Sequence, residues 1–422
     1  MNLLVIGGGG REHAVIKALK KSKGVERIYA LPGNGGIAAD AECYPVKATD
    51  VGGIVDFAKS HKVDFAVVTP DDPLVLGCVD ALEDLGIPCF GPRANAAVIE
   101  GSKVFSKDLM KKYGIPTAAS ETFDNAEDAI AYLKSGSFPA VIKADGLALG
   151  KGVIIAQNPE EAETAVREIM CDKIFGASGN KILVEEFLTG PEVSVLSFTD
   201  GKTVVPMVSS MDHKRAGDGD EGLNTGGMGT VAPNPYFTEE IAKECMETIF
   251  LPTVNAMNAE GRTFRGCLYF GLMLTPKGPK VIEYNCRFGD PETQVVLPLL
   301  KSDLFEIMRA VHDGTLTEDL VKFDGGAACC VVLASDGYPK KYESGFEIAL
   351  PETRGGEYIY VAGAKREGDA LLTAGGRVLG AVATAENLEK AVEGAYALAG
   401  KIHFKNAYMR RDIGKRALAA LK

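Results

Sequence analysis

Lysines and glycines in the segment VIKADGLALGKGV, residues 141–153, have the types and spacing that bind nucleotide phosphates. Lys143 ends a predicted strand, and a glycine-rich stretch that contains Lys151 follows it. Glycine lets backbone amides approach a phosphate closely, so this stretch predicts a loop that covers the γ-phosphate. It is not the GxxxxGK[ST] phosphate loop, because Val153 follows the glycine after Lys151 and no hydroxyl is placed for magnesium.

Two carboxylates stand side by side at the end of a later predicted strand. The segment VEEFL, residues 184–188, brings Glu185 and Glu186 next to an aromatic side chain. An adenine ring can lie against such apolar groups and hydrogen-bond to the adjacent backbone. Glu192 follows a Gly-Pro turn, where its carboxylate can accept hydrogen bonds from ribose hydroxyls. These residues predict the adenosine end of a nucleotide site.

A third group of polar residues lies in the run VIEYNCRFGDPETQ, residues 281–294. The period-two alternation of a strand puts Glu283 and Asn285 on one face, with Arg287 on the same face if the strand continues that far. Carboxylate and amide oxygens with room for water and phosphate oxygens are typical of magnesium sites. The run therefore predicts a magnesium site whose metal also touches a phosphate.

Two glycine clusters near the amino terminus resemble anion-binding turns. In LLVIGGGGREHA the dinucleotide-binding spacing GxGxxG fails, because the third glycine position falls on Glu12 or His13. A nicotinamide cofactor is therefore not expected, whereas a strand–turn–helix that holds another phosphate, or simply packs, fits the pattern. The polar side chains of Arg11, Glu12 and His13 predict that this helix start faces a site. The second cluster, LPGNGG at 31–36, can present backbone N–H groups to an anion or form an ordinary turn.

Hydrophobic periodicity predicts an α/β and α+β multidomain fold that positions these residues. Residues 1–101 alternate β-rich runs with helical periods, which indicates βαβ units and a parallel sheet with ligands at the strand carboxyl ends. Residues 102–189 predict a compact α+β lid around the glycine loop, and residues 190–324 predict a catalytic floor. Residues 325–422 predict a small β-rich domain that ends in a helical tail. Helices are expected at 11–20, 103–113, 126–134, 159–170, 239–260 and 303–314.

Composition excludes several classes of protein. The 422 residues exceed the length at which a single core stops growing, so three or four packed domains are expected. The net charge of -11 disfavours nucleic acid and anionic membranes as partners. No apolar run approaches the ~20 residues that cross a bilayer, and no basic region precedes the short apolar stretch at the amino terminus. Nine cysteines without CxxC spacing predict reduced thiols, so we expect a cytoplasmic protein.

The order of these features is more specific than any one of them. Lys103, Lys143, the glycine loop, VEEFL, Glu192 and the pair Glu283 and Asn285 follow one another as in the ATP-grasp superfamily, whose two α+β lobes enclose ATP. Within it, the chain resembles the phosphoribosylamine–glycine ligase family over nearly its whole length. The resemblance rests on IGGGGREHA, LPGNGG, IKADGLALGKGV, MDHKRAGDGDEGLNTGGMGTVAP, IEYNCRFGDPETQ and MRRDIG. The most specific of these are the NTGGMG loop and the NCRFGDPETQ run.

Two segments depart from the family pattern. Thr69–Pro73, TPDDP, stands where the family usually has a glycine and a GPE-like turn, which leaves the role of this loop open. Leu223 stands where a proline usually precedes Asn224, a change that a backbone role survives.

The resemblance implies an ATP-dependent ligase of de novo purine synthesis. ATP would activate glycine as glycyl phosphate, and the amine of 5-phosphoribosylamine would then displace phosphate to give glycinamide ribonucleotide. The implied cofactors are ATP and Mg²⁺, or Mn²⁺, and the implied partners are the small molecules glycine and 5-phosphoribosylamine. No protein nucleophile is needed, so catalysis would come from positioning and charge neutralisation. We expect the chain to act alone as a monomer, with a weak dimer as the alternative.

The same resemblance assigns roles around the nucleotide. Lys103 and Lys143 would contact the α- and β-phosphates, and the loop around Lys151 would close over the γ-phosphate. Glu283 and Asn285 would coordinate the metal ion. The nucleoside would be held by Glu185, Glu186, Phe187, Leu188 and Glu192. The expected catalytic residues are Lys143, Lys151 and Arg287.

The residues expected around the two substrates are small, polar or cationic. The loop that begins at Asn224 would use its amides to hold glycyl phosphate or the second substrate. Arg287 would pair with a carboxylate or a phosphate. Arg410 and Arg411, at the expected start of the last helix, would bind the 5-phosphate, with a solvated basic helix end as the alternative. The complete expected set is Gly9, Gly10, Asn34, Asp212, Asn224, Thr225, Gly226, Gly227, Arg287, Arg410 and Arg411.

Three other functions are compatible with parts of the sequence. Another ATP-grasp ligase would use a different acid and amine on the same lobes, and the NTGGMG and MRRDIG motifs argue against it. A nucleotide-binding protein without turnover would lack the magnesium ligands or the loop lysines, which are all present. A dehydrogenase is disfavoured by the failed glycine spacing, and titration with NADH would test it.

Overall fold

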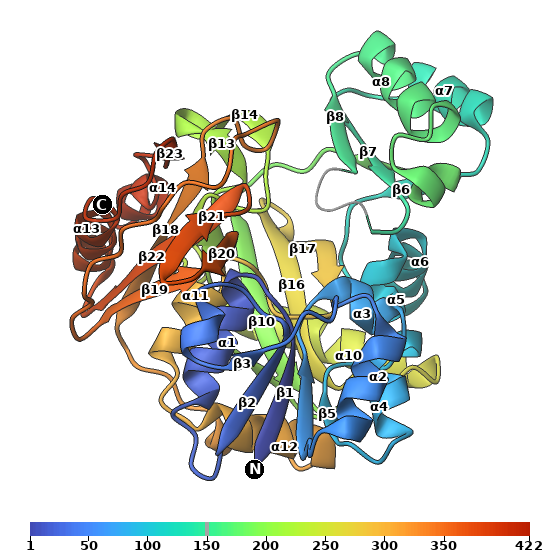
Figure 1. Cartoon of the computed structure of the whole chain (residues 1–422). Helices are drawn as coiled ribbons and strands as arrows, with labels where there is room; N and C mark the ends of the chain where they lie inside the picture. Colours follow the sequence, from blue (N-terminus) through green and yellow to red (C-terminus); the bar gives the residue numbers. More distant parts are fainter. Residues whose placement is uncertain (148–151) are drawn as a thin grey trace.

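The computed structural model describes residues 1–147 and 152–422. The chain forms the α/β and α+β multidomain fold that the sequence predicts. Figure 1 shows three parts packed against one another: the amino-terminal domain, the floor and the carboxyl-terminal domain. The lid stands apart from them, above the amino-terminal domain.

The amino-terminal domain is built on a five-stranded parallel sheet in the order β3-β2-β1-β4-β5. Alternate side chains of a strand point to opposite faces, so Leu3 and Val5 of β1 enter one core whereas Leu4 and Ile6 enter the other. Helices pack on both faces, and the carboxyl ends of β1 and β4 are the edge at which ligands of such sheets bind. The bounds are β1 Asn2–Gly7, β2 Arg27–Pro32, β3 Glu42–Cys43, β4 Phe65–Val68, β5 Cys89–Phe90, α1 Gly10–Leu19, α2 Val51–Ser60, α3 Asp71–Val75, α4 Cys78–Glu83 and α5 Ala94–Gly101.

The lid is a four-stranded antiparallel sheet in the order β6-β9-β7-β8 with helices on one side. Its two predicted helices α6 and α7 have the bounds expected from the sequence, because Ser102 and Asn125 cap their amino termini with side-chain hydrogen bonds. The buried side chains of the lid form a small core of their own. The bounds are α6 Lys103–Tyr113, β6 Ser120–Phe123, α7 Ala126–Lys134, β7 Ala140–Ala144, β8 Val153–Ala156, α8 Pro159–Val166, η2 Arg167–Cys171, η3 Gly176–Asn180 and β9 Ile182–Glu186.

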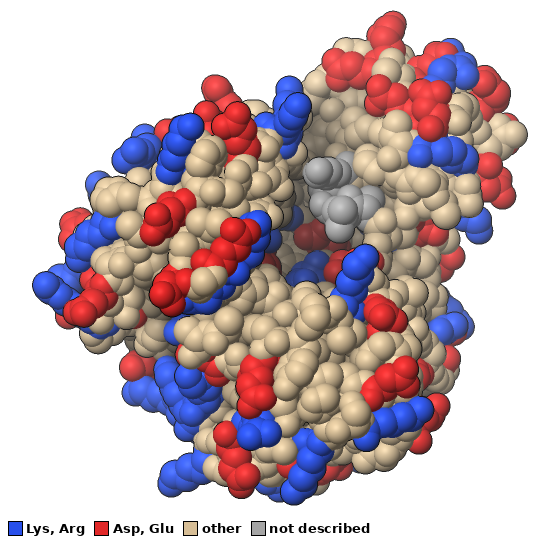
Figure 2. Space-filling model, in the orientation of Figure 1, with Lys and Arg blue, Asp and Glu red and all other residues tan. Residues whose placement is uncertain are grey.

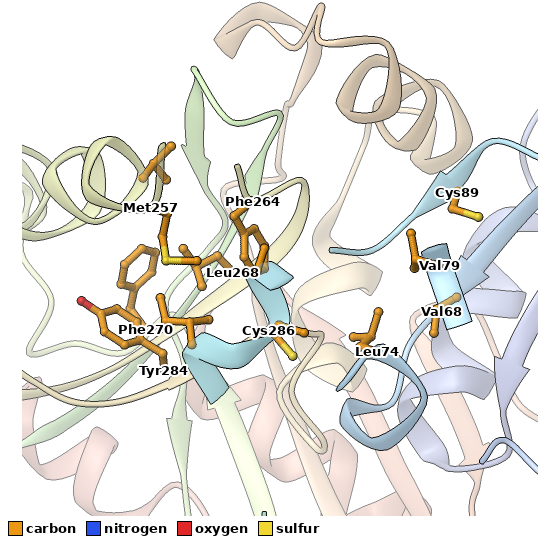
Figure 3. Close-up of a cluster of buried hydrophobic side chains, with 14 of the residues drawn as sticks. Val68, Leu74, Val79, Cys89, Met257, Phe264, Leu268, Phe270, Tyr284 and Cys286 are labelled. Carbon is orange, nitrogen blue, oxygen red and sulfur yellow. The ribbon is translucent and has the colours of Figure 1, made fainter. Parts of the chain in front are cut away.

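The floor is a four-stranded antiparallel sheet in the order β11-β10-β16-β17. Phe270 and Tyr284 of this sheet share one hydrophobic core with Met257 and with Leu74 and Val79 of the amino-terminal domain (Figure 3). A shared core makes the floor and the amino-terminal domain one rigid base. The bounds are β10 Glu192–Thr199, β11 Val204–Pro206, α9 Glu239–Cys245, η5 Met246–Phe250, α10 Leu251–Ala259, β16 Gly266–Thr275, β17 Gly278–Asn285, α11 Thr293–Val296, η6 Leu297–Leu299, α12 Leu304–Asp313 and η7 Glu318–Leu320.

The carboxyl-terminal domain is a six-stranded sheet in the order β12-β15-β18-β22-β19, with β23 also paired to β18. Two of its strands, β12 Met211–Asp212 and β15 Gly229–Ala232, precede residue 325, where the sequence suggests that this domain begins. The floor segment therefore contributes strands to the neighbouring sheet. The other bounds are β13 Arg215–Gly217, η4 Asp218–Asp220, β14 Glu221–Asn224, β18 Ala327–Ser335, β19 Glu357–Val361, β20 Ala364–Glu367, β21 Ala370–Thr373, β22 Arg377–Ala385, α13 Leu388–Ala399, β23 Ala407–Tyr408 and α14 Lys415–Ala420.

Two whole-chain features bear on the expectations from composition. Across the residues that the structure describes, no helix combines the length and hydropathy needed to span a bilayer. The cysteines are free thiols, and most of them are buried.

Candidate active site

Polar side chains converge in a hollow below the lid. Figure 2 shows this hollow between the lid and the domains beneath it, with acidic and basic side chains at its bottom. The residues that line it come from the lid strands, from β17 of the floor and from the turns that follow β1 and β4. The sequence predicts most of these segments as parts of a nucleotide site.

A buried carboxylate holds two lysines at the lid side of the site. Glu185 of β9 lies with its Oε2 2.9 Å from Nζ of Lys143 and its Oε1 3.3 Å from Nζ of Lys107. Lys143 also donates to the backbone oxygen of Ile282 at 2.9 Å, which ties the lid to β17. Burial lowers the pKa of Lys107 to about 8. The Glu185 carboxylate is thus enclosed between these lysines, and its predicted place beside adenine stays a prediction.

Lys103 lies close to this pair, at the first turn of α6. Its Nζ donates to the backbone oxygen of Gly146 at 2.6 Å. Burial and the nearby charge of Lys143 lower the pKa of Lys103. Asp145 accepts hydrogen bonds from Ser102 Oγ and Val104 N, so the turn after β7 is fixed to the start of α6. The structure thus brings Lys103 and Lys143 together as the sequence predicts, while Lys151 lies outside the described residues.

The chain beyond β9 offers backbone and an aromatic face to a ring. The ladder of β9 ends at Glu186, whose carboxylate accepts from Ala119 N and pairs with Lys280. Phe187 follows outside the sheet and is partly exposed, at 39%, and Leu188 stands beside it. The Glu186 side chain is thus occupied, whereas the segment Phe187–Leu188 remains accessible to a ligand.

The predicted metal ligands lie on one strand with space beneath them. Glu283 and Asn285 belong to β17 and pair with Gly271 and Tyr269 of β16. A Cβ at Gly271 would come within 2.7 Å of Glu283 Cγ, so the glycine leaves room for this side chain. Lys214 places its Nζ 3.2 Å from Glu283 Oε1 and 3.6 Å from Glu192 Oε2. Lys214 lowers the pKa of Glu283 to about 2, against the opposing effect of burial.

This donor set fits a magnesium ion that arrives with a nucleotide. Among the described residues, no group of three or more His, Cys, Asp or Glu side chains could hold a metal by itself. Magnesium usually takes one or two carboxylates and completes its shell with waters and substrate phosphates. Glu283 and Asn285 supply hard oxygens in that number, and the Lys214 ammonium already occupies a cation position beside them.

Arg287 is held by acidic side chains of the amino-terminal domain. The strand β17 ends at Asn285, so the expectation that Arg287 continues its face is wrong. The guanidinium Nη2 lies 2.9 Å from Oε1 of buried Glu100, which also accepts from Cys286 N. Arg11 and Arg287 both donate to the backbone oxygen of Phe288, at 3.2 and 3.4 Å, so these two cations are adjacent.

The loop after β4, Thr69–Pro73, differs from the family pattern and brings a carboxylate close to Arg11 and Arg287. Asp71 begins α3, and Thr69 Oγ1 anchors the turn on the backbone oxygen of Ile6. Burial alone would raise the pKa of Asp71, but Arg287 and Arg11 hold it below its usual value. The TPDDP segment therefore belongs to the site.

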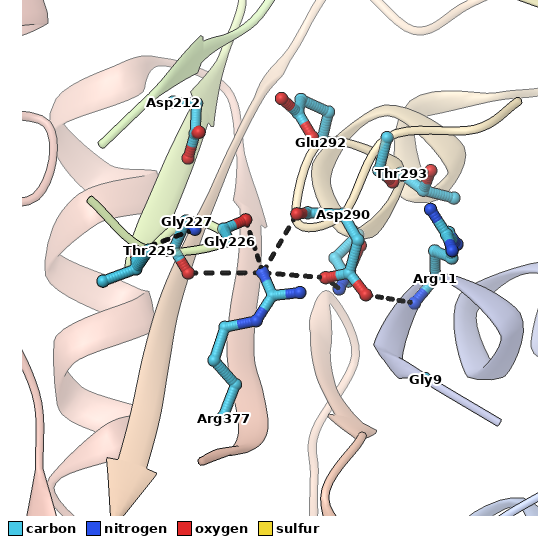
Figure 4. Close-up of polar contacts among 12 residues, drawn as sticks. Gly9, Arg11, Asp212, Thr225, Gly226, Gly227, Asp290, Glu292, Thr293 and Arg377 are labelled. Atoms are coloured by element: carbon cyan, nitrogen blue, oxygen red, sulfur yellow. Dashed lines mark hydrogen bonds and ion pairs between the residues drawn. The ribbon is translucent and has the colours of Figure 1, made fainter. Parts of the chain in front are cut away.

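The glycine loop after β14 does not present free amides. Thr225 N donates to Lys214 O, Gly226 N to Tyr338 Oη, Gly227 N to Thr225 Oγ1, and Met228 N to His213 O. These amides have partners within the protein, so the prediction that they hold glycyl phosphate or the second substrate gains no support from them. The carbonyl oxygens of Gly226 and Gly227 instead accept from Arg377 Nη1, at 2.7 and 3.3 Å (Figure 4).

A half-buried carboxylate, Asp212, and a buried one, Glu292, lie near this loop. A Cβ at Gly227 would lie 2.7 Å from Asp212 Oδ1 and 2.4 Å from Pro291, so only glycine fits between them. Glu292 accepts from Tyr269 Oη and Ser194 Oγ. Burial raises the pKa of both Asp212 and Glu292, and the charge of Glu292 adds to the shift at Asp212. Figure 4 shows Asp212 and Glu292 in the same region as the Gly226–Gly227 loop.

The amino-terminal glycine turns are joints between domains. Asn34 donates from Nδ2 to Gly8 O and Val361 O, and its Oδ1 accepts from Gly36 N and Ile37 N. Gly9 N donates to the carboxylate of Glu12, and a Cβ at Gly10 would lie 2.6 Å from Gln294. The Gly9 amide and the Asn34 side chain thus have partners within the protein, and phosphate binding by Gly9, Gly10 and Asn34 stays a prediction.

The MRRDIG motif, residues 409–414, also forms contacts within the protein, which connect it to the segment 215–220. Arg410 lies in the loop before α14, which begins only at Lys415, and its side chain is 1% exposed. Its guanidinium donates to Asp412, Asp220 and the backbone oxygen of Arg215. Four of the five guanidinium N–H donors are therefore engaged within the protein, and the phosphate role of Arg410 stays a prediction that these contacts do not support. Arg411 donates its backbone N–H to Asp218.

Several residues of the site are absent from the sequence-based set. Lys214 follows Asp212 in MDHKR, Asp71 follows a strand end, and Arg377 begins a β-rich run of the carboxyl-terminal domain. Charged residues directly after strands were the available signal for Asp71. Arg377 has no local signal, because its partners Gly226 and Asp290 are distant in the sequence.

Comparisons with known proteins agree with this arrangement. Models of the phosphoribosylglycinamide synthetase N domain, ATP-grasp (A) domain and C domain match residues 1–100, 101–293 and 328–416. The chain belongs to the phosphoribosylglycinamide synthetase family. A phosphoribosylamine–glycine ligase of Clostridium acetobutylicum is 46% identical over 98% of this chain and 100% of that protein.

Solved structures extend the comparison to the fold. The crystal structure of the phosphoribosylamine–glycine ligase of Thermotoga maritima matches with a TM-score of 0.87 and 35% identity, covering 98% of this chain and 100% of that one. The biotin carboxylase domain of Hydrogenobacter thermophilus 2-oxoglutarate carboxylase, solved with magnesium ADP and bicarbonate, has a TM-score of 0.76. It is 18% identical over 97% of this chain and 91% of that chain, so it shares the fold with this family member.

Proposed function

We propose that this chain joins glycine to 5-phosphoribosylamine at the expense of ATP, giving glycinamide ribonucleotide, ADP and phosphate in purine synthesis. The observation that carries the proposal is full-length similarity to phosphoribosylamine–glycine ligases, with the predicted lysines and carboxylates gathered in one cleft. We also propose that the enzyme works in the cytoplasm as a monomer, on small molecules, without nucleic acid or membrane.

The reaction needs two bond exchanges and no protein nucleophile. A carboxylate oxygen of glycine attacks the γ-phosphorus, and the bond to the β-phosphate oxygen breaks as ADP leaves with its electron pair. The amine of phosphoribosylamine then attacks the carbonyl carbon of glycyl phosphate, loses a proton and expels phosphate. Each step proceeds by positioning and by neutralising the charge on phosphoryl oxygens.

The nucleotide lies between the lid and β17 in this proposal. Lys103 and Lys143 face the phosphates, and Glu185 keeps Lys143 oriented. The backbone of Phe187 and Leu188 meets the adenine, and Glu192 receives the ribose. The loop around Lys151 covers the γ-phosphate.

Glu283 and Asn285 hold the metal of the nucleotide. Magnesium, or manganese in its place, draws negative charge from the phosphates and orients them. The fit rests on the oxygen donors, on Gly271, which leaves room for the Glu283 side chain, and on the ammonium of Lys214 that stands beside Glu283. Magnesium is the first choice, because the donor set is small and hard.

The two substrates meet between the arginines and the carboxylates of Asp212 and Glu292. Arg11 and Arg287 provide adjacent positive charge for an anionic group, in place of Arg410. The Asp212 and Glu292 carboxylates are suited to an ammonium group such as that of glycine. The loop from Asn224 to Gly227 encloses this end of the site, held by Arg377.

The direct test measures phosphate release from magnesium ATP with glycine, with and without phosphoribosylamine made in place from ribose 5-phosphate and ammonia. Release that needs both substrates, together with a product containing glycine by mass spectrometry, is the expected outcome. Release that ignores glycine would point to another ATP-grasp ligase with a different acid, and replacement acids and amines would then be screened.

A further inference from the structure

Lys214 connects the two carboxylates that the proposed nucleotide site uses. Its ammonium lies 3.2 Å from Glu283 and 3.6 Å from Glu192, and these contacts place it between the metal strand and the start of β10. The Lys214 side chain is 38% exposed, so it faces the open cleft. Neither of its carboxylate partners is enclosed, since Glu283 is 40% and Glu192 51% exposed.

The backbone of Lys214 is fixed although its side chain reaches into the cleft. Its carbonyl oxygen accepts from both N and Oγ1 of Thr225, each at 2.8 Å. The preceding residue, His213, is buried, with Nδ1 against Gly229 O and Nε2 accepting from Gly414 N. A lysine has four flexible side-chain bonds on this fixed base. The ammonium can therefore change partners by side-chain rotation alone.

We propose that Lys214 is a catalytic residue that leaves Glu283 when the metal nucleotide binds and then holds the phosphoryl group being transferred. The inference deepens the proposed function and rests on Glu283 being a metal ligand. Its own basis is the shared contact of one ammonium with Glu283 and Glu192.

Geometry explains the exchange. Oxygens on adjacent corners around a magnesium ion with bonds of about 2.1 Å lie about 3 Å apart. An ammonium 3.2 Å from Glu283 Oε1 thus lies within the distance at which the other ligands of a metal bound to this oxygen would stand. The ammonium must yield this position, and the nearest new anionic partner is a phosphate of the nucleotide. Its three donors then neutralise charge that grows on the phosphoryl oxygens.

The exchange also gives the free enzyme a resident cation. Without an ammonium, Glu283 and Glu192 would face each other across the cleft as like charges. Lys214 offsets this repulsion until the nucleotide brings its own metal. Lys214 is therefore a competitor of the metal in the free enzyme and a partner of the phosphate in the complex.

The test compares Lys214→Met and Lys214→Arg with Lys301→Met in the full chain. Lys301 forms an exposed ion pair with Asp324 at the same distance, 3.2 Å, and lies outside the cleft, so it is the matched control. Mn²⁺ binding in the presence of ADP is followed by electron paramagnetic resonance, and turnover is followed by phosphate release. Thermal unfolding checks that each variant is folded.

Loss of the competing ammonium should tighten Mn²⁺ binding by about threefold, the effect of one half-exposed ion pair. Turnover of Lys214→Met should fall about 100-fold or more, with the KM for ATP changed by less than about threefold. Lys214→Arg should recover part of the turnover, and Lys301→Met should match the wild type in both assays.

Two results would overturn the proposal. Weaker Mn²⁺ binding in Lys214→Met would mean that the lysine merely organises the carboxylates, and unchanged turnover would remove it from the phosphoryl step. If Lys214→Met fails to fold, Lys214→Gln also removes the charge and supplies the same comparison. Mn²⁺ binding with ADP needs neither glycine nor phosphoribosylamine, so a failure of the proposed substrates would appear in the wild type and remain distinguishable.

Discussion

Polar and charged residues in the nucleotide cleft differ from those at the contacts between domains. In the cleft a ligand can replace their partners, whereas between domains their partners are fixed within the protein. In the cleft, Lys214 is 38% exposed and its ammonium touches carboxylates that a ligand can reach. At the contacts between domains, Asn34 makes four hydrogen bonds through one side chain. Arg410 is 1% exposed and donates to two carboxylates and one backbone oxygen. Motifs that look equally functional in the sequence thus separate into exchangeable contacts and permanent ones.

The difference has an energetic basis. An ion pair that faces solvent contributes little free energy, so a ligand can replace one partner at small cost. A buried charge that loses its partner costs about 3–5 kcal/mol, so such groups stay paired throughout a catalytic cycle. His13 is a buried polar side chain that likewise keeps its partners. It accepts a hydrogen bond from Val361 N and faces Asp40, and the contact with Val361 joins the amino- and carboxyl-terminal domains. The exposed fraction of a side chain and the number of its hydrogen-bond partners therefore distinguish residues of the site from residues that connect domains.

The largest predicted effect is a loss of turnover, and it concerns a cleft residue whose partner a ligand can replace. Glu283→Gln keeps the size of the side chain but removes the charge that holds the metal. We expect turnover to fall about 100-fold or more while thermal unfolding changes little, because metal stabilisation of the transferring phosphate is worth several kcal/mol. Phosphate release at saturating magnesium measures this. Unchanged release would exclude Glu283 from the metal site.

Arg410→Ala tests a buried residue whose contacts are permanent. The substitution removes a buried guanidinium and leaves Asp412 without its cationic partner, whereas Asp220 keeps Arg416. We expect the free energy of unfolding to fall by about 3 kcal/mol, with the KM for phosphoribosylamine unaltered. Urea titration and substrate kinetics test the two halves separately. A raised KM in a fully stable variant would return Arg410 to the substrate site.

The buried His213 predicts how the joint responds to pH. Burial, reinforced by Arg410, lowers the pKa of His213 from 6.5 to about 4, so the unfolded chain binds the proton more readily between these values. Stability is thus complete above pH 6.5 and is lost as the pH falls toward 4, by about 2 kcal/mol at pH 5. His213→Gln keeps a donor and an acceptor but does not titrate.

The corresponding measurement is urea unfolding of the wild type and His213→Gln at pH 7 and pH 5. Other titrating groups, including His13, are present in both proteins and cancel in the difference. The variant should lose less stability on acidification than the wild type. Parallel losses would show that His213 is not the group responsible.

The smallest predicted effect separates the exposed rim of a joint from its buried part. Lys20 pairs with Asp40 at 2.7 Å but is 44% exposed, and Asp40 keeps His13 and Lys17 as partners. We expect Lys20→Met to change the free energy of unfolding by about 0.5 kcal/mol or less. Thermal unfolding at low and high salt measures it. A loss near that of Arg410→Ala would contradict the division by exposure.

Much of the fold was predictable from the sequence, because local patterns carry it. The strands of the parallel sheet follow their apolar runs, and α6 and α7 begin where Ser102 and Asn125 cap them. The carboxylate and amide of Glu283 and Asn285 were predictable as neighbours, since a strand places alternate residues on one face. The approach of Lys103 to Lys143 follows from the order of the ATP-grasp elements.

The partners of site residues were less predictable, because they come from distant segments. Glu283 meets Lys214 across separate strands, Arg287 meets Glu100 of α5, and Arg377 holds Gly226 from another domain. Asn34 and Arg410 have side chains that suit anions, and only the tertiary structure reveals their partners within the protein.

The sequence by itself determined the family, the order of the elements and the residue types that the reaction needs, because periodicity and spacing are written along the chain. The tertiary structure decided which of those residues remain available. Availability depends on burial and on the number of partners that surround each polar group, and these are set by packing between segments far apart in the sequence. For this reason Lys214 has contacts that a ligand can replace, whereas Arg410 is enclosed among its partners.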